Sequence, residues 1–339
     1  MAGNSALWQD PPPLGGDRLM TRLTTILALI VGFLATLVPA EPAGYTGRAL
    51  AMPTTSRDGG TEQIPATILK PPGDGPFSAV VVLHDCSGLG ARSSGAPMRW
   101  ATLLAGQGYV VILPDSFSTR GFPEGVCTAP EEAVPRLRRV APLQRAFDAY
   151  AALAYLRSLP FVDGAHVGVI GGSHGGSATL AAMVTPASNR APLVEERRHG
   201  FAAGVALYPG CAGQYGTWSA THEFGDHGAV TAYAGVYQPI APLLILVGER
   251  DDWTPAKPCE ELTERAEAAG YAVAIKVYPG ARHSFDSSAP ARYLPNRRSA
   301  NSETGRGATT GGDPVAWADA IKEVTAFFAK ELKEQISLP

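Results

Sequence analysis

The segment Gly171–Gly175, with the sequence Gly-Gly-Ser-His-Gly, decides the fold class of this 339-residue chain. It follows the apolar run His166–Ile170 and precedes the helix-prone run Ser177–Met183. A serine between glycines at a strand-to-helix junction is typical of a nucleophile elbow, a sharp turn with little room for side chains beside the serine. The alternative is a glycine-rich turn that only packs a helix close to a strand. The choice depends on whether the partners of a catalytic serine occur later in the chain.

An acid and a histidine follow two later strand patterns, in the chain order that an elbow serine requires. The apolar run 241–247 leads into a turn that contains Asp251, and the run 272–278 leads to His283. We expect His283 to take the proton of the serine hydroxyl and Asp251 to fix the tautomer of the imidazole. Asp252 is the alternative acid, because sequence position does not separate two adjacent carboxylates. Taken singly, an Asp after a strand is more often a turn former, and a lone His is more often structural.

Two backbone amides are candidate donors to the oxyanion that forms when a serine attacks a carbonyl. The first is the N–H of His174, the residue after the nucleophile, whose imidazole we expect to point away from the serine hydroxyl. The second comes from the loop after an early strand. The run Phe77–Leu83 has a buried-strand pattern and opens into residues 84–88, where the N–H of Cys86 is the best candidate.

Strand and helix patterns alternate along most of the chain. This alternation predicts an α/β fold with a mostly parallel central sheet and helices on both faces. An alternating stretch at 61–69 predicts one early antiparallel strand. The expected parallel strands are 77–83, 109–113, 166–170, 204–208, 241–247 and 272–278, and the expected helices are 98–106, 143–158, 177–183, 262–269 and 314–332.

Two segments interrupt this alternation. Residues 217–237 contain several aromatic and histidine side chains, which predicts a cap-like insertion near 212–238 on the substrate side. His222, Asp226 and His227 in this insertion do not match the spacing of a metal site, so a polar loop is the preferred interpretation and no metal is expected. Residues 299–313 are rich in Gly, Ser and Thr, and we expect a mobile loop there.

With these residues assembled, the chain resembles the dienelactone hydrolase family of α/β-hydrolases, from about Ala66 to Leu332. Residues 84–88, 113–121 and 251–255 are similar to loops of that family. The resemblance implies an α/β-hydrolase fold and acyl-transfer chemistry. It also implies Asp251 as the acid and His283 as the base.

The nucleophile departs from the family pattern. Founding members of the family use cysteine, whereas this chain has Ser173. A thiolate paired with an imidazole suits an activated enol-lactone, and a Ser-His-Asp set is the general solution for esters. The resemblance therefore implies fold and reaction type rather than dienelactone as the substrate.

Two side chains are candidates for substrate binding. Arg120 follows a strand end on the side of the sheet that carries the elbow, where a guanidinium can hold a carboxylate with two hydrogen bonds. The alternative for Arg120 is an ion pair with a neighbour such as Asp115. Trp253 is either a wall of the substrate pocket or a structural plug.

The N-terminal residues resemble an export signal. Arg18 and Arg22 precede the uncharged apolar stretch 26–38, and small residues before Glu41 fit cleavage after Ala40. We expect a leader at residues 1–40, for which Met20 is an alternative start, and one catalytic domain at 41–339. The alternative to a cleaved signal is an N-terminal membrane anchor. The formal net charge of −3 and the lack of a basic stripe argue against a nucleic-acid partner.

The chain contains four cysteines, an even number in a protein with an apparent export signal. Cys86 and Cys127 follow the first and second expected parallel strands, and Cys211 and Cys259 follow the fourth and fifth. If each pair of strands is adjacent, the spacing between strands is close to the Cα separation of a disulfide. This predicts Cys86–Cys127 and Cys211–Cys259, and the alternative is four free buried thiols.

Together these features predict a secreted or periplasmic hydrolase that cleaves carboxylic esters or lactones through an acyl-enzyme, without a cofactor. Its partner is a small-molecule substrate. A peptidase or a polyester-cleaving esterase on the same fold is an alternative. A binding module that retains the three residues without activity is another.

Overall fold

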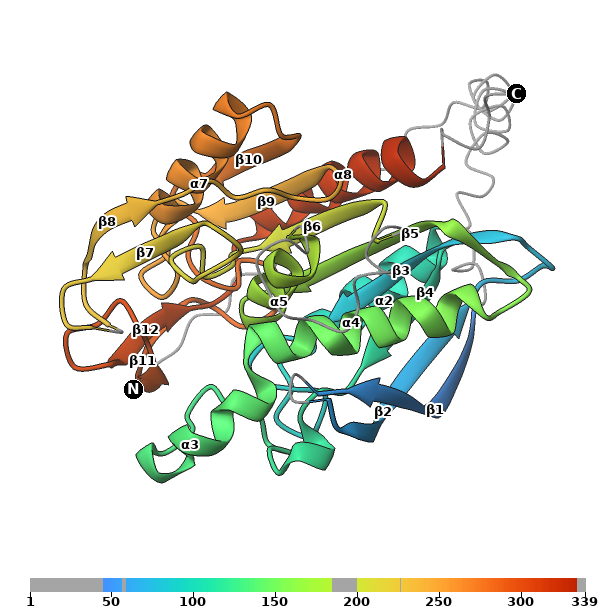
Figure 1. Cartoon of the computed structure of the whole chain (residues 1–339), viewed down its shortest axis with the longest axis horizontal. Helices are drawn as coiled ribbons and strands as arrows, with labels where there is room; N and C mark the ends of the chain where they lie inside the picture. The colour runs from blue at the N-terminus through green and yellow to red at the C-terminus, as the bar shows by residue number, and fades with distance from the viewer. Residues whose placement is uncertain (1–44, 57–58, 185–199, 226, 334–339) are drawn as a thin grey trace, which may run out of the picture. The chain divides into compact units, whose positions relative to one another are not determined.

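The computed structural model describes residues 45–56, 59–184, 200–225 and 227–333. The predicted leader at 1–40 lies outside these residues. An eight-stranded sheet has the order β1-β2-β4-β3-β5-β6-β9-β10 (Figure 1). β1 pairs with β2, and β2 with β4, in antiparallel fashion, and all later neighbours are parallel. The strands are β1 (Thr46–Thr55), β2 (Thr61–Lys70), β3 (Phe77–Leu83), β4 (Val110–Pro114), β5 (Val162–Gly172), β6 (Ala203–Leu207), β9 (Leu243–Gly248) and β10 (Val273–Tyr278).

The predicted mostly parallel sheet is confirmed, and β1 is a strand that the sequence patterns did not indicate. Its residues are mostly exposed, so it lacks the apolar run that marks the buried strands. The expected helices are also present, some with an earlier start. The helices are α2 (Ala96–Gly106), α3 (Val134–Leu137), α4 (Pro142–Arg157), α5 (His174–Met183), α7 (Ala256–Ala268) and α8 (Pro314–Leu332), with short 3-10 helices η2 (Ser118–Arg120), η3 (Glu131–Ala133) and η4 (Arg138–Val140).

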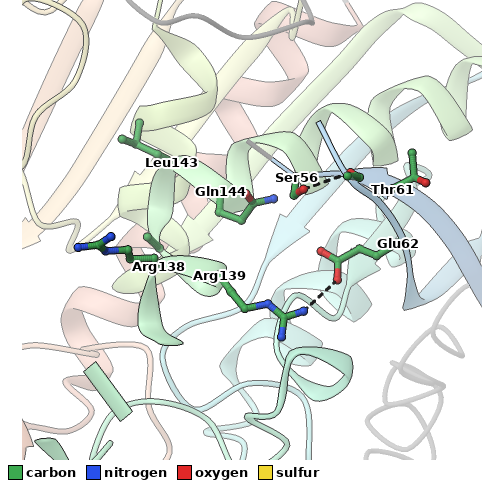
Figure 2. Close-up of a pocket in the computed structure, with 9 residues that line it drawn as sticks. Ser56, Thr61, Glu62, Arg138, Arg139, Leu143 and Gln144 are labelled. Carbon is green, nitrogen blue, oxygen red and sulfur yellow. Dashed lines mark hydrogen bonds and ion pairs between the residues drawn. The ribbon is translucent and has the colours of Figure 1, made fainter. Parts of the chain in front are cut away.

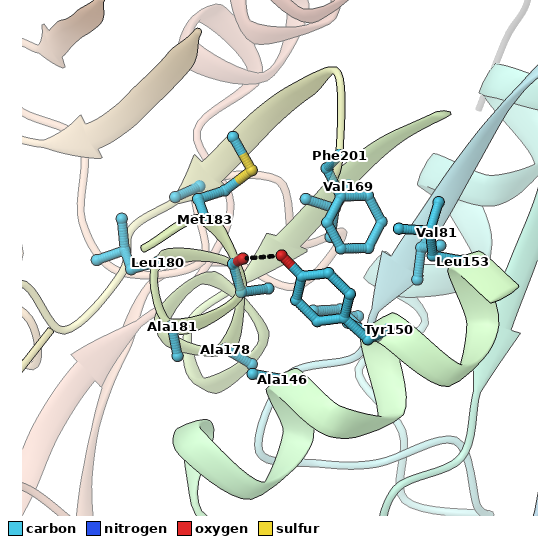
Figure 3. Close-up of a cluster of buried hydrophobic side chains, with 14 of the residues drawn as sticks. Val81, Ala146, Tyr150, Leu153, Val169, Ala178, Leu180, Ala181, Met183 and Phe201 are labelled. Atoms are coloured by element: carbon cyan, nitrogen blue, oxygen red, sulfur yellow. Dashed lines mark hydrogen bonds between the residues drawn. The ribbon is translucent and has the colours of Figure 1, made fainter. Parts of the chain in front are cut away.

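Helices cover both faces of the sheet because successive strand residues point to opposite sides. In β3, Val81 belongs to the buried apolar cluster that also contains residues of α4, α5 and α7, whereas Val80 and Val82 belong to the cluster that contains residues of α2 and α8. Figure 3 shows the first cluster, in which the Tyr150 hydroxyl donates to the carbonyl of Ala182 at 3.0 Å. This bond joins α4 to α5, the helix that begins directly after the elbow serine.

Two short hairpins stand apart from the main sheet. β7 (Ser219–His222) pairs with β8 (Val230–Ala234) within the predicted insertion. β11 (Arg292–Arg298) pairs with β12 (Arg306–Thr310), so the expectation of a mobile loop at 299–313 is wrong. Gly305, in the turn before β12, has φ 70°, and Gly307, within β12, has φ 98°, and glycine adopts both values without strain. Composition alone did not separate such a turn from a flexible segment.

In the described part of the chain, no helix is both long enough and apolar enough to cross a membrane.

Candidate active site

Ser173 lies on a sharp turn between β5 and α5. Its backbone has φ 54° and ψ −117°, a strained conformation for a residue with a side chain. A Cβ atom on Gly171 would lie 2.4 Å from the backbone of Gly175, and one on Gly175 would lie 2.0 Å from the carbonyl oxygen of Leu83. Both glycines are therefore required by the close approach of α5 to the strands, as the sequence pattern predicted.

The structure joins Ser173 to His283 and Asp251 in one hydrogen-bonded chain. The Oγ of Ser173 lies 2.8 Å from Nε2 of His283, and Nδ1 of His283 lies 2.8 Å from Oδ2 of Asp251. All three residues are buried, and they follow the carboxyl ends of β5, β10 and β9. The other carboxylate oxygen of Asp251 accepts from the N–H groups of Trp253 and Thr254. Asp251 is thus held by the turn after β9 and oriented toward the imidazole.

Asp252 has different surroundings from Asp251. Its carboxylate accepts from the N–H and the hydroxyl of Thr309, both at 2.7 Å, and lies 3.7 Å from the guanidinium of Arg282. Nearly half of its side chain is exposed. Asp252 therefore binds the β11–β12 hairpin to the turn, while Asp251 contacts the histidine.

Thr254 is a residue of this site that the sequence analysis did not single out. Its Oγ1 lies 2.9 Å from Oδ2 of Asp251, 2.9 Å from Nδ1 of His283 and 3.0 Å from the carbonyl oxygen of Tyr208. A threonine hydroxyl has one proton to donate, so Thr254 donates to either Oδ2 of Asp251 or the carbonyl of Tyr208 at any one time. The only sequence feature that pointed to Thr254 as a site residue was its position three residues after Asp251.

A cavity of about 790 Å³ opens above Ser173. One side is apolar and comes from residues 126–142, which include Val126, Val134, Leu137 and Val140. The other sides come from the β7–β8 hairpin and from residues 298–301. None of the described residues that line it is acidic. The remaining lining residues are Cys86, Cys127, Arg138, Ala141, Pro142, His174, Ser177, Gly210, Ala212, Gly213, Tyr215, Ala220, His222, Gly225, Trp253, Thr254, Arg298, Ala300 and Asn301.

Both residues expected to donate amides to an oxyanion line this cavity together with Ser173. Cys86 is held in place by a disulfide to Cys127 and by its carbonyl, which accepts from the N–H of Val126 at 2.7 Å. His174 is the first residue of α5, so its N–H belongs to a helix N-terminus. The structure therefore places both residues at the same cavity as Ser173, and their role as amide donors stays a prediction.

The predicted disulfides Cys86–Cys127 and Cys211–Cys259 are confirmed, each with a Cα separation of 5.0 Å. The condition behind the prediction also holds, since β3 is adjacent to β4 and β6 is adjacent to β9. No cysteine is free. The first bridge forms part of the cavity wall, and the second ties the loop after β6 to α7.

Trp253 is a wall of the cavity. Its ring centroid lies 4.6 Å from that of His283, and its Nε1 donates to the carbonyl of Arg298 at 2.7 Å. The tryptophan therefore packs against the imidazole and joins the turn after β9 to the β11–β12 hairpin.

Arg120 does not line the cavity, so its predicted role in holding a substrate carboxylate is wrong. Its side chain is fully buried and donates two hydrogen bonds to Asp148, at 2.6 and 2.7 Å. It also pairs with Glu62 at 2.6 Å. The alternative, an ion pair, is what the structure shows, with these partners instead of Asp115. Strand-end position alone did not reveal that carboxylates of α4 and β2 already occupy the guanidinium.

A second cavity, of about 700 Å³, shares Arg138 with the first. Figure 2 shows Glu62 and Arg139 facing each other in it, with 3.8 Å between Oε2 of Glu62 and Nη2 of Arg139. None of the site residues predicted from the sequence lines this cavity. The candidate active site is therefore assigned to the cavity above Ser173.

Of the residues considered for a metal, the structure describes His222 and His227 but not Asp226. The Nδ1 of His222 lies 3.0 Å from the carbonyl oxygen of Gly228. Among the described residues there is no group of three side chains placed to bind a metal ion.

A parallel sheet of this strand order with a serine elbow at the end of a central strand defines the α/β-hydrolase class of enzymes. A model described as the dienelactone hydrolase family matches residues 64–332, and the chain belongs to this family. The predicted resemblance is thus confirmed, and the protein is a carboxylic ester hydrolase.

Similar proteins agree with this assignment. A protein of Methylorubrum extorquens, provisionally named a carboxymethylenebutenolidase, is 26% identical over 290 residues, which cover 85% of this chain and 88% of that protein. A structure from Klebsiella pneumoniae, provisionally named a dienelactone hydrolase, has a TM-score of 0.55 at 20% identity and covers 84% of this chain and 99% of that one. Esterase 2 of Thermogutta terrifontis has a TM-score of 0.54 at 16% identity, with 87% and 97% coverage. The two structures show the shared fold.

Proposed function

We propose that the protein is an exported serine hydrolase that cleaves carboxylic esters or lactones through an acyl-enzyme on Ser173. The observation that supports this most is the hydrogen-bonded chain from Ser173 through His283 to Asp251. Such a chain activates a hydroxyl that is otherwise a weak nucleophile.

In the proposed mechanism, Oγ of Ser173 attacks the carbonyl carbon while Nε2 of His283 takes the hydroxyl proton. Asp251 keeps the proton of the imidazole on Nδ1 and stabilises the imidazolium that forms. The N–H groups of Cys86 and His174 stabilise the oxyanion of the tetrahedral intermediate. His283 then protonates the departing alkoxide, and the acyl group remains on Ser173.

Deacylation repeats these steps with water as the nucleophile. His283 takes a proton from water, the hydroxide attacks the acyl-enzyme, and Ser173 leaves with the proton returned by His283. For a lactone, the alkoxide stays attached to the acyl group, so a single hydroxy acid is released. These steps use water and the side chains of the protein, and they involve no cofactor.

The cavity supports substrates with an apolar acyl group. Val126, Val134, Leu137 and Val140 provide an apolar side of the cavity. Burial of methylene groups against such a wall favours binding by roughly 0.8 kcal/mol for each group. The expected substrates are therefore esters or lactones with an aliphatic or aromatic acyl part.

Export is proposed from two features. The sequence of residues 1–40 has the pattern of a cleaved signal, and the described residues contain two disulfides, which persist mainly in oxidising compartments. N-terminal sequencing of exported protein is expected to begin at or near Glu41. Recovery of the intact segment 20–40 from a membrane fraction would instead indicate an anchor.

A hydrolysis panel tests the proposed activity. Esters of increasing acyl length, lactones and aminoacyl arylamides are assayed with the wild-type protein and with Ser173→Ala. We expect turnover of esters or lactones that Ser173→Ala abolishes. Faster turnover of arylamides would indicate a peptidase, and no turnover of any substrate by folded protein would indicate a binding module.

A further inference from the structure

Arg145 is a buried cation that the proposed mechanism does not use. It lies in α4, its residue is fully buried, and among the described residues it forms no ion pair within 4.0 Å. Burial lowers the pKa of Arg145 to about 10, so it is charged at neutral pH. Its guanidinium lies over the ring of Phe117, 5.0 Å from the centroid. Burying a charge without a direct counter-ion costs free energy. The hydrogen bonds of Arg145 must offset part of this cost, so the groups that it contacts are informative.

The guanidinium has two hydrogen-bond acceptors, and they belong to different loops. Nη2 donates to the carbonyl oxygen of His84 at 2.7 Å, and Nη1 lies 2.8 Å from Nδ1 of His174. His84 is two residues before Cys86, and His174 directly follows Ser173. One side chain thus joins the two segments whose amides we assign to the oxyanion.

The contact with Arg145 also fixes the state of the His174 side chain. A guanidinium only donates, so Nδ1 of His174 must accept, and the ring proton is on Nε2. Burial, together with the charge of Arg145, lowers the pKa of His174 to about 3. His174 is therefore neutral at neutral pH and cannot compete with His283 as a base through Nδ1.

We infer that Arg145 is a positioning residue for the oxyanion hole, because its planar fork holds the His84–Cys86 segment and the start of α5 at a fixed separation. This inference rests on the proposed function. Two rigid donors about 3 Å from the oxyanion are effective only when both are in place, and loss of one donor lowers kcat by about 10²–10³-fold. A shift of the donors is expected to cost less than the loss of one.

The first test replaces the acceptor on His174. In His174→Asn, Oδ1 takes the position of Nδ1 and still accepts from Arg145, whereas His174→Leu offers no acceptor. Both variants keep the backbone N–H. We expect kcat to fall roughly 10-fold or more further in His174→Leu than in His174→Asn, with little difference in KM between the two variants. Equal kcat values for the two variants would contradict the inference.

The second test changes the cation itself. Arg145→Lys keeps the charge but loses the fork, so it reaches only one acceptor. Arg120→Lys is the matched control, because Arg120 is equally buried but binds Asp148 and Glu62 instead of the oxyanion segments. Active-site titration with a fluorophosphonate counts the competent sites in each variant, so that partial unfolding does not enter kcat.

The decisive readout is the inhibition constant of a trifluoromethyl ketone, which forms a tetrahedral oxyanion adduct on the serine. We expect Arg145→Lys to weaken this inhibitor by roughly the same 10- to 100-fold by which kcat/KM falls, while Arg120→Lys changes neither per titrated site. An unchanged inhibition constant in Arg145→Lys would overturn the inference. Absence of titration in the wild-type protein would overturn the proposed function, and this inference with it.

Discussion

We call Ser173, His283 and Asp251 the floor, of which Ser173 lines the cavity, and we call the apolar side at residues 126–142 the wall. These two regions are built in different ways. On the floor, Ser173, His283 and Asp251 are at most 7% exposed, and each is held by hydrogen bonds. On the wall, Val134 is 39% exposed, and the chain forms only short helices between 131 and 140. The floor fixes the position of reacting atoms, whereas the wall offers shape and apolar surface. The comparison implies that chemistry and substrate choice depend on separate regions.

A disulfide and a hydrogen bond link the two regions. The Cys86–Cys127 disulfide and the hydrogen bond from Val126 to Cys86 connect the wall to a proposed oxyanion donor. The Cys211–Cys259 bridge has no such connection to Cys86. This difference makes the two disulfides useful for separating stability from catalysis.

The largest effects are expected from substitutions on the floor. Ser173→Ala and His283→Ala should each lower kcat by about 10⁵-fold or more, because the three residues act as a unit. Asp251→Asn should cost somewhat less, about 10⁴-fold, because it disturbs the tautomer and leaves the nucleophile in place. Steady-state ester hydrolysis measures all three.

Asp252→Asn is the control for the acid, since Asp252 contacts Thr309 and Arg282 instead of His283. Its kcat should stay within a few-fold of the wild-type value. The assignment of the acid would move to Asp252 if this variant lost as much activity as predicted for Asp251→Asn while Asp251→Asn stayed near wild type.

Removing the disulfides should separate their roles. Cys211→Ala/Cys259→Ala should lower the free energy of unfolding by about 4 kcal/mol for its 48-residue separation, with kcat little changed. Cys127→Ala should have a similar cost in stability, about 4 kcal/mol, and should also lower kcat, because Cys86 loses its tether. Urea titrations and kinetics on the same samples provide both quantities. Equal kcat in the two variants would break the proposed link between wall and floor.

Substitutions on the wall should change substrate choice with a smaller effect. Leu137→Ala removes apolar surface that lines the cavity, so the ratio of kcat/KM for a long acyl ester to that for an acetate ester should fall by roughly tenfold. The activity on the acetate ester should be nearly unchanged. A loss of the same size for both esters would show that this wall does not discriminate between acyl groups.

The last expected effect is on the pH dependence of stability. Burial lowers the pKa of both His84 and His174 in the folded protein, so the unfolded chain takes up more protons below pH 6.5. The free energy of unfolding should therefore fall as the pH is lowered from 6.5 toward 4, by up to about 1.4 kcal/mol per pH unit for each histidine.

His174→Asn removes one of these two titrating groups, so its stability should decline less steeply than that of the wild type over the same range. Leu137→Ala, on the wall, should leave the slope unchanged. Urea titrations at pH 6.5, 5.5 and 4.5 compare the three proteins. An identical slope in wild type and His174→Asn would contradict the assignment of a neutral His174.

The sequence predicted the floor better than the wall, for a physical reason. Strand ends of a parallel sheet meet at one edge, so residues after buried apolar runs were placed correctly even when far apart in the chain. That rule gave Ser173, Asp251, His283 and both disulfides. It did not predict the partners of buried charges, and Arg120 was misassigned because its contacts with Asp148 and Glu62 depend on how α4 and β2 pack.

No comparable sequence pattern predicts the structure of the wall. Residues 126–142 have neither a strand period nor a long helix period, and their apolar side chains meet only after folding. The same holds for Arg145, whose two acceptors lie 61 and 29 residues away. Such contacts require the packing of distant segments, which a local pattern does not encode.

The central claim is that Ser173 is an activated nucleophile. Mass spectrometry of the protein after treatment with a fluorophosphonate tests it most directly, because only a serine with an adjacent base reacts quickly. We predict one adduct per chain, on the peptide that contains Ser173, with no adduct in Ser173→Ala and much slower labelling in His283→Ala. Folded wild-type protein that remains unlabelled, or that is labelled on another residue, would contradict the account.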